Sequence, residues 1–377
     1  MVTGAFKGLE RPVSLLGLGC MRFPVIGGED SKIDYEKAQE IVDYSLEKGI
    51  NYLDTAHGYH GGESQVFLGE ALKKYPRESY HLATKMPMWG VNKSEDLSEI
   101  FALQQKRLQT DYFDFYLLHA LDAEKYEKVL KFKAYDFVSK LKDEGKVKNI
   151  GFSFHDSPEV LEKIASSHKW DFAQLQINYV DWEAQRAREQ YEILQKYDIL
   201  VIIMEPVRGG ALANPGPRAE KLLKQARPDK SIASWALRYA ASRPGVLTVL
   251  SGMSNMDQLE DNIETLLNFE PLTPADYDLL NEVAKAFKHK DLIPCTACRY
   301  CMQDCPNGID IPGVFTIYNR FVNDGDEKAF INDYMTIAES ERAQNCIECH
   351  NCKPYCPQFI EIPEKLKHIS EFSEKLL

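Results

Sequence analysis

The chain of 377 residues alternates short apolar runs with longer segments in which apolar positions recur every three or four residues. The short runs predict β-strands, and the longer segments predict amphipathic helices. The predicted strands are residues 15–21, 52–55, 81–85, 113–119, 147–154, 173–179, 200–205 and 247–252. The predicted helices are residues 35–48, 63–74, 94–108, 125–144, 158–167, 183–196, 231–242 and 255–267.

Each predicted helix is long enough to return the chain, so that the next strand runs parallel to the one before it. Eight such units in about 250 residues match the size and count of a (β/α)8 TIM barrel. A doubly wound parallel sheet is the alternative α/β fold. Its glycine fingerprint is missing, because Gly17 and Gly19 are not followed by a third glycine at the required spacing.

Composition and charge narrow the class of protein. Apolar residues make up 44% of the chain and charged residues 27%, which is typical of a globular protein with a buried core. A net charge of −12 gives no general attraction to nucleic acid or to anionic membranes. No secretion signal or membrane-spanning apolar run is present. We therefore expect a cytoplasmic protein that binds neither nucleic acid nor membrane.

Eight of the nine cysteines form two groups with the same spacing, C-x2-C-x2-C-x3-C-P. The groups are Cys295, Cys298, Cys301 and Cys305, and Cys346, Cys349, Cys352 and Cys356. They form an internal repeat with an offset of 51 residues, because CPNGIDIP at 305–312 corresponds to CPQFIEIP at 356–363. Disulfides and structural zinc sites are the alternatives. A chain without a secretion signal disfavours disulfides, and zinc needs neither the third close cysteine nor the trailing proline.

This spacing resembles that of two-cluster bacterial ferredoxins. The resemblance implies two [4Fe-4S] clusters with crossed ligation, one held by Cys295, Cys298, Cys301 and Cys356 and the other by Cys346, Cys349, Cys352 and Cys305. Helical pattern at 314–321 and 327–340 separates the two groups and favours a mainly helical variant. We expect a barrel domain over 1–290 and a ferredoxin-like domain over 291–377. The ninth cysteine, Cys20, is expected to be a buried thiol in the first strand.

A barrel of this kind carries its chemistry at the carboxyl ends of its strands, so polar residues at those ends are candidates. Asp54 closes the second predicted strand and Tyr59 follows on the loop. Lys85 closes the third strand and His119 the fourth. With these four residues in this order, residues 1–290 resemble the aldo-keto reductase family. With the cysteine repeat, the chain is similar to the subgroup that has a C-terminal ferredoxin-like domain.

The proposed roles follow from carbonyl chemistry. A carbonyl that receives a hydride becomes an alkoxide, and a tyrosine of pKa about 10 protonates it poorly unless the phenolate is stabilised. Tyr59 is therefore expected to be the general acid/base and Lys85 the stabilising cation. Asp54 would orient Lys85, and His119 would donate a hydrogen bond to the carbonyl oxygen. The expected activity is an NAD(P)-dependent oxidoreductase that interconverts an aldehyde, ketone or sugar carbonyl and an alcohol. Candidate mouth residues without an assigned role are His57, His60, Phe23, Trp89, Tyr179 and Trp182.

The resemblance also implies that NADPH or NADH lies extended across the barrel mouth. Ser153 and Gln174 would hold the carboxamide, residues 204–209 would run under the nicotinamide and pyrophosphate, and the helix after the eighth strand suits a phosphate. The candidate cofactor residues are Gly19, Cys20, Met21, Ser153, Gln174, Met204, Glu205, Val207, Gly209, Gly252, Ser254, Gln258, Asp261 and Asn262.

Three positions depart from the family pattern. Phe154 stands where an asparagine is common, and Met204 replaces the tyrosine that stacks on the nicotinamide. No basic residue between Ser254 and Gln258 is available for the 2′-phosphate of NADPH. We therefore expect NADH to be accepted at least as well as NADPH.

The role of the clusters stays open at this point. A hydride carries two electrons, whereas each cluster transfers one electron at a time. No sequence motif indicates a flavin that would convert between the two. The clusters would either pass electrons to a ferredoxin or other redox protein, or serve as structure. The alternative to a small-molecule carbonyl or alcohol substrate is a non-catalytic NAD(P)-binding electron-transfer or sensor subunit.

Overall fold

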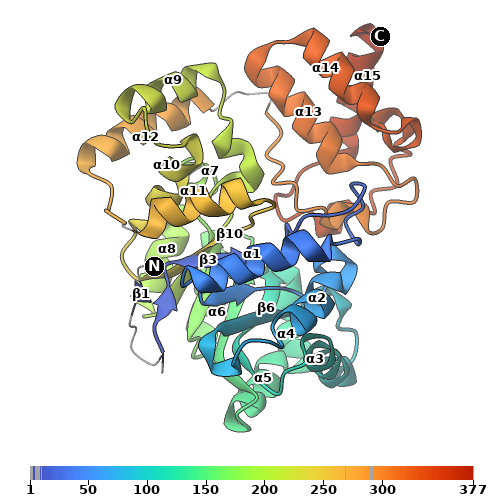
Figure 1. Cartoon of the computed structure of the whole chain (residues 1–377). Coiled ribbons are helices and arrows are strands. Elements are labelled where there is room, and N and C mark those ends of the chain that lie inside the picture. Colours follow the sequence, from blue (N-terminus) through green and yellow to red (C-terminus); the bar gives the residue numbers. More distant parts are fainter. Residues whose placement is uncertain (1–2, 5–8, 10, 268, 288–291, 377) are drawn as a thin grey trace. The chain divides into compact units, whose positions relative to one another are not determined.

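The computed structural model describes residues 3–4, 9, 11–267, 269–287 and 292–376 (Figure 1). The chain divides into two compact units: Met1–Pro206 with Ala236–Leu272, and Val207–Trp235 with Thr273–Leu377. The domain boundary predicted between residues 290 and 291 lies outside the described residues. Among the described helices, none is both long and apolar enough to cross a membrane.

The first unit contains a closed barrel of parallel strands in the order β10-β3-β4-β5-β6-β7-β8-β9. The strands are β3 Leu16–Gly19, β4 Tyr52–Asp54, β5 His81–Pro87, β6 Phe113–Leu121, β7 Val147–Phe154, β8 Phe172–Gln176, β9 Leu200–Met204 and β10 Val246–Ser251. The helices that follow them are α1 Tyr35–Glu47, α2 Glu63–Ala71, α3 Ser94–Leu108, α4 Ala123–Phe132, α5 Ala134–Asp143, α6 Pro158–Ser167, α7 Asp181–Ala184, α8 Ala187–Lys196, α10 Ile232–Ala241 and α11 Met256–Leu267. A short antiparallel ribbon pairs β1 Thr3–Gly4 with β2 Val13–Ser14. The predicted (β/α)8 barrel is confirmed.

Two predicted helices are broken in the structure. The helix expected at 125–144 is divided into α4 and α5 at Lys133, whose φ is +54°. The helix expected at 183–196 is divided into α7 and α8 at Arg186, whose φ is +53°. A single left-handed residue turns the helix axis without interrupting the run of apolar positions, so the periodicity does not reveal the break. Cys20 is fully buried, as expected, but it lies in a turn just after β3 and not in the strand.

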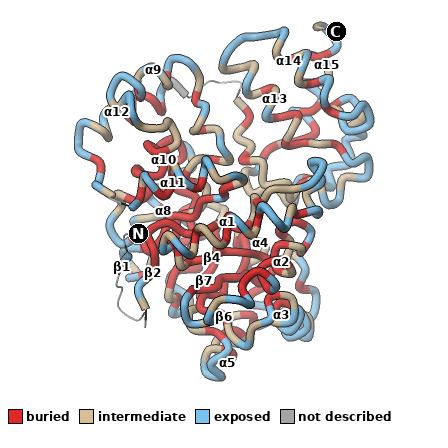
Figure 2. The backbone as a smooth tube through the Cα atoms, in the orientation of Figure 1, coloured by how far each residue is buried: buried red, intermediate tan, exposed pale blue. Residues whose placement is uncertain are grey.

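Large side chains fill the barrel interior. The rings of Tyr52 and Phe115 lie 4.9 Å apart, and those of Phe115 and Phe172 lie 5.1 Å apart. They pack with Val13, Ala83, Leu117, Ile202, Leu247 and Leu250. Figure 2 shows the strands as buried and much of the outer helix surface as exposed. The barrel is thus a packed core, and its chemistry must lie at one of its ends.

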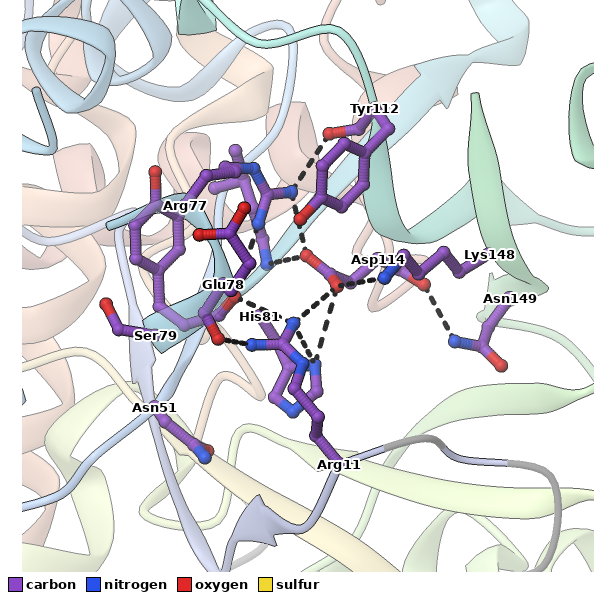
Figure 3. A network of polar contacts seen from close by, with 12 residues as sticks. Arg11, Asn51, Arg77, Glu78, Ser79, His81, Tyr112, Asp114, Lys148 and Asn149 are labelled. Atoms are coloured by element: carbon purple, nitrogen blue, oxygen red, sulfur yellow. Dashed lines mark hydrogen bonds and ion pairs between the residues drawn. The ribbon is translucent and has the colours of Figure 1, made fainter. Parts of the chain in front are cut away.

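Asp114 anchors a polar network at the amino-terminal end of β6 (Figure 3). Its carboxylate accepts hydrogen bonds from Arg11 at 2.8 Å and from Arg77 at 2.7 Å, and another from the backbone N–H of Leu82 at 3.0 Å. His81 and Lys148 lie 3.7 and 3.9 Å away. The carboxylate is 2% exposed and therefore depends on these cations for its charge. The network ties the segment before β2 to three barrel strands, β5, β6 and β7.

Replacing Asp114 with asparagine should lower the free energy of unfolding by about 3 kcal/mol, because it leaves two arginines facing a neutral group. Burial alone would raise the pKa of Asp114, but His81 and Arg77 outweigh burial and hold it well below its usual range. The lowered pKa stabilises the fold above the unfolded value of about 3.9, and that contribution is lost as pH falls further. In urea unfolding at pH 7, the free energy of unfolding should be larger for the wild type than for Asp114→Asn. This difference should shrink below about pH 4. The exposed Asp111→Asn variant serves as the control and should unfold like the wild type.

The second unit is mainly helical, and it includes the C-terminal region for which a mainly helical structure was predicted. Its helices are α9 Pro217–Ala226, α12 Pro274–Phe287, α13 Ile311–Asp324, α14 Glu327–Thr336 and α15 Ile362–Leu376. Asp310 and Asp326 cap the first turns of α13 and α14 by accepting hydrogen bonds from Gly313 N and Ala329 N. Val314, Phe315 and Ile369 are fully buried in a core that these helices share with the cysteine segments. Helices α13 and α14 fill the interval between the two cysteine groups.

Candidate active site

Four predicted catalytic residues meet at the carboxyl ends of the barrel strands. Asp54 follows Tyr52 by two residues, Lys85 follows Ala83, and His119 follows Leu117. Side chains two residues apart on a strand share a face, and Tyr52, Ala83 and Leu117 all belong to the interior core. The three polar residues are therefore the next interior layer. Strands β5 and β6 extend two residues beyond the predicted ends at Lys85 and His119.

Lys85 is the centre of this layer. Its Nζ donates to Asp54 Oδ1 at 2.5 Å, to the backbone oxygen of Thr55 at 3.0 Å and to Tyr59 Oη at 3.1 Å. These bonds use all three donors of an ammonium group. Because the Tyr59 oxygen accepts from Lys85, the phenol can present its own proton to a substrate.

Burial dominates the electrostatics of the group. Lys85 and Asp54 are 1% and 2% exposed. Burial lowers the pKa of Lys85 and raises that of Asp54, and the attraction between the two charges opposes both shifts. Burial, with the charge of Lys85 nearby, also holds the pKa of His119 well below 6.5. A neutral His119 keeps one ring N–H, which can donate a hydrogen bond at neutral pH.

Aromatic side chains surround the group unevenly. The Trp89 ring lies 4.9 Å from that of His119, and the Tyr59 ring lies 6.2 Å from it. The other candidate mouth aromatics pack elsewhere: Phe23 against Phe67 at 5.0 Å, and Tyr179 and Trp182 against Tyr239 at 6.1 and 6.2 Å. Trp89 is thus the mouth aromatic that contacts a predicted catalytic residue.

The two histidines that flank Tyr59 differ. His60 is 3% exposed, and its Nδ1 lies 2.7 Å from the backbone oxygen of Asp30. It therefore ties the Asp30 loop to the turn that carries Tyr59. His57 is only partly buried, and burial, with the Arg107 charge, lowers its pKa. The structure assigns neither His57 nor His60 a role beyond these contacts.

The predicted carboxamide contacts lie on neighbouring strands at the same end. Gln174 is 2% exposed, and its Oε1 has no hydrogen-bond partner among the described residues. A buried amide oxygen without a partner fits a ligand that donates a hydrogen bond, as a carboxamide does. Ser153 pairs in register with Gln174, and its hydroxyl accepts a hydrogen bond from Ala120 N at 2.7 Å.

The departure at Phe154 has a simple explanation in the barrel. Side chains alternate across a strand, so Phe154 faces away from the side on which Ser153 lies. It is 1% exposed, and its ring lies 6.4 Å from that of Phe152. The phenylalanine therefore belongs to the packing between the barrel and its helices.

The segment after β10 opens helix α11. Ser254 N donates to Gln258 Oε1 at 2.8 Å, and Gln258 N donates to Asn255 Oδ1 at 2.9 Å. Asn262 Nδ2 donates to Ser251 Oγ at 3.0 Å, which holds the helix against the end of β10. Asp261 also lies on this helix. Several predicted cofactor residues thus organise the helix terminus that would receive a phosphate.

Arg22 is a cation at this end that the sequence analysis missed. A Cβ added to Gly252 would lie 3.0 Å from the Arg22 side chain, and Arg22 lies 3.9 Å from the Glu205 carboxylate. Glu205 itself holds a φ of +53°, just after Met204. The sequence signal for Arg22 was its place directly after the Gly19, Cys20 and Met21 segment that follows β3.

The cysteines gather into two sites, and each site draws on both halves of the repeat. Site A combines Cys295, Cys298, Cys301 and Cys356, and site B combines Cys305, Cys346, Cys349 and Cys352. Each site takes three thiols from one loop and the fourth from the other half, which is the crossed arrangement of the expectation. In the described part of the chain, no group of three or more His, Cys, Asp or Glu side chains is arranged to hold a single metal ion.

The backbone repeats along with the cysteines. Ala297 and Arg299 flank Cys298 with φ of +52° and +64°, and Glu348 and His350 flank Cys349 with φ of +54° and +59°. Left-handed backbone costs a residue with a side chain about 1–2 kcal/mol, so these loops need something that holds them. Alternating turns of this kind point successive N–H groups into a concavity that suits an anionic cluster.

The thiols also fit such a group. Burial, with the neighbouring thiols Cys298 and Cys295, raises the pKa of Cys301 far above its usual range. Burial, with the thiols of site B, raises the pKa of Cys352 to about 11. Four thiolates in one apolar site need cations between them, and iron supplies that charge.

Comparisons with known proteins agree with this division. The aldo/keto reductase family profile matches residues 15–285, and the 4Fe-4S dicluster domain profile matches residues 294–360. The chain is 28% identical over 306 residues to the uncharacterized oxidoreductase YqkF of Bacillus subtilis, covering 72% of this chain and 93% of that protein. It is 28% identical over 320 residues to the NADH-specific methylglyoxal reductase of Escherichia coli, covering 73% and 96%.

A solved structure gives the same result. The aldo-keto reductase AKR11C1 of Bacillus halodurans, in its holo form, matches with a TM-score of 0.62 and 29% identity, covering 76% of this chain and 97% of that chain. The family profile spans most of the chain, and the relatives are covered almost completely. The chain therefore belongs to the aldo/keto reductase family, whose members are oxidoreductases, and it carries a 4Fe-4S dicluster domain after its barrel.

Proposed function

We propose that this chain reduces a small-molecule aldehyde, ketone or sugar carbonyl to an alcohol, or runs the reverse reaction, with Tyr59 as the general acid/base. The observation that carries the proposal is the contact of Lys85 Nζ with both Asp54 Oδ1, at 2.5 Å, and Tyr59 Oη, at 3.1 Å. An ammonium held by a buried carboxylate against a phenol oxygen stabilises the phenolate left after proton transfer.

The residues of the chain account for the proton. Bound nicotinamide dinucleotide supplies a hydride to the carbonyl carbon. Tyr59 gives its proton to the carbonyl oxygen as charge develops there, and Lys85 stabilises the resulting phenolate. Neutral His119 donates a hydrogen bond to the same oxygen, and Trp89 forms a wall beside it. Tyr59 regains its proton from solvent, so the cycle is balanced.

We propose that the dinucleotide binds along the predicted segments. Ser153 and Gln174 would hold the carboxamide, and the unpartnered Oε1 of Gln174 supports this assignment. Residues 204–209 would run beside the nicotinamide and pyrophosphate, and the start of α11 would receive the adenosine phosphate. The remaining candidates are Gly19, Cys20, Met21, Gly252, Ser254, Gln258, Asp261 and Asn262.

We propose further that sites A and B each hold one [4Fe-4S] cluster, which makes two clusters per chain. The crossed grouping of four thiols per site and the repeated left-handed backbone support this number. The domain that carries them is proposed to cover residues 291–377 and the barrel domain residues 1–290.

The test is an anaerobic assay of the cluster-loaded protein with a panel of aldehydes, ketones and sugars, including methylglyoxal, because one relative is a methylglyoxal reductase. Oxidation of NADH that depends on the carbonyl, with the alcohol as product, is the expected result. Binding of NADH without turnover of any carbonyl or alcohol would overturn the proposal and support an electron-transfer or sensor subunit instead.

NADH should serve at least as well as NADPH. The first turn of α11 carries Asp257 and no basic residue between Ser254 and Gln258, so a 2′-phosphate there meets negative charge and no basic residue of that turn. Steady-state kcat/KM measured with each nucleotide at one saturating carbonyl tests the expectation. A clear preference for NADPH would contradict it, and loss of that preference in Arg22→Ala would then identify Arg22 as the phosphate partner.

A further inference from the structure

The loop that follows β9 is held in an unusual backbone conformation. Residues 207–213 begin three residues after the end of β9 and include a tight turn, Arg208–Ala213, in which Gly209 and Gly210 have φ of +64° and +96°. Gly210 N and Leu212 N both donate to Val207 O at 3.1 Å, and Leu212 is fully buried. The loop is thus a fixed element of the second unit, and it includes the proposed nucleotide contacts Val207 and Gly209.

Gly209 lies directly against the backbone of Thr296. A Cβ added to Gly209 would lie 2.3 Å from the Thr296 carbonyl oxygen and 2.9 Å from its Cα. These distances are far inside van der Waals contact, and neither atom is part of a side chain that could swing away. A Cβ added to the next residue, Gly210, would meet nothing within 4 Å. Only the first of the two glycines is therefore required by contact with a neighbour.

Thr296 lies inside the cysteine loop of site A. It directly follows Cys295, lines that site together with Cys298, and is 2% exposed. Its equivalent in the internal repeat, 51 residues later, is Ile347, which directly follows Cys346 and is 62% exposed. The repeat therefore makes two similar cysteine loops that differ at this position: Thr296 is buried with Gly209 against it, whereas Ile347 is exposed.

We propose that the contact between Gly209 and Thr296 couples nucleotide binding to the assembly of the cluster in site A. Ala297 and Arg299 hold left-handed backbone within three residues of Thr296. A cluster held by the thiols of site A would keep the loop in this shape. Gly209 packs against Thr296 in this loop, so the shape of the loop determines the positions of Val207 and Gly209. Gly209 and Thr296 are positioning residues in this scheme. The inference rests on the proposed function, because it uses the nucleotide contacts assigned there.

The first test compares Gly209→Ala with its neighbour Gly210→Ala in the cluster-loaded protein. Alanine tolerates a φ near +60° better than one near +96°, so the control variant carries the greater backbone strain. If strain alone moved the loop, Gly210→Ala would be the worse variant. We expect the NADH dissociation constant, measured by fluorescence titration, to rise about tenfold in Gly209→Ala, within the usual range of coupling. It should change less than about twofold in Gly210→Ala.

The second readout is spectroscopic, because coupling between two sites is reciprocal. NADH should shift the electron-spin signal of the dithionite-reduced cluster in site A, both in the wild type and in Gly210→Ala. The same addition should leave the signal of Gly209→Ala unchanged. A purely structural role for Gly209 would alter stability and leave this nucleotide-dependent shift in place.

A second pair of variants guards against poor folding of Gly209→Ala. Cys298→Ser and Cys349→Ser remove equivalent thiols from site A and site B. Loss of the site A cluster should weaken NADH binding about tenfold, whereas loss of the site B cluster should leave the dissociation constant within about twofold of wild type.

The outcomes separate the two proposals. Equal NADH affinity in both glycine variants, or equal effects of the two cysteine variants, would overturn the coupling and leave the proposed reductase intact. Failure of the wild-type protein to bind either nucleotide would overturn the proposed function itself, whatever the variants do.

Discussion

Replacing Tyr59 with phenylalanine should lower carbonyl turnover by about 10²–10⁴-fold, the usual contribution of a positioned general acid. The substitution removes only the oxygen that lies 3.1 Å from Lys85 Nζ and leaves the buried ring in place. The NADH dissociation constant should stay close to that of the wild type, because the phenol proton has no part in holding the nucleotide. Single-turnover kinetics would show that the loss lies in the chemical step.

A matched control is Tyr126→Phe, which removes a hydroxyl that donates to Ser167 Oγ at 2.6 Å on the outer helices. This variant should keep wild-type turnover. If Tyr59→Phe also kept wild-type turnover, another group would have to protonate the alkoxide, and the assignment of Tyr59 would be wrong. A parallel loss in Lys85→Met, with Tyr59 intact, would support the role of the ammonium.

Replacing Cys356 with alanine should remove the cluster of site A and leave that of site B. In the crossed arrangement Cys356 completes the set of Cys295, Cys298 and Cys301, although it follows Cys352 closely in the sequence. Iron content should fall from about eight to about four atoms per chain, since each cluster holds four. The electron-spin signal that remains should be the one that remains in Cys301→Ala.

The comparison variant is Cys352→Ala, which should lose the cluster of site B and keep the electron-spin signal of site A. If ligation followed the sequence groups instead, Cys356→Ala and Cys352→Ala would lose the same cluster and show the same spectrum. That result would refute the crossed sites. Iron content alone cannot decide between the two arrangements, so both measurements are needed.

The fold was predictable because each barrel strand is a run of apolar residues between polar helix faces. The three polar residues at the strand ends stood out for the same reason: Asp54, Lys85 and His119 interrupt otherwise apolar segments, and each lies two residues beyond a core position. The cysteine repeat could be predicted from the spacing of the cysteines alone. In these cases the signal is local in the sequence.

The features that escaped prediction depend on residues far apart in the chain or on single dihedral angles. Arg11, Arg77 and Asp114 meet only because the barrel brings their segments together. The break between α4 and α5 depends on the φ of Lys133 alone. The contact of Gly209 with Thr296 joins two loops 87 residues apart, and no periodicity reports it.

The crossed cysteine sites also constrain how the protein is made. The last thiol of site A, Cys356, is synthesised 55 residues after Cys301, and the first thiol of site B, Cys305, precedes its three partners by 41 residues or more. Neither site is complete until the chain has passed Cys352, and site A waits for Cys356. If sites A and B each hold a cluster, as proposed, iron delivery must follow translation of both halves. A chain that terminates before residue 346 would then lose both clusters while keeping every barrel strand.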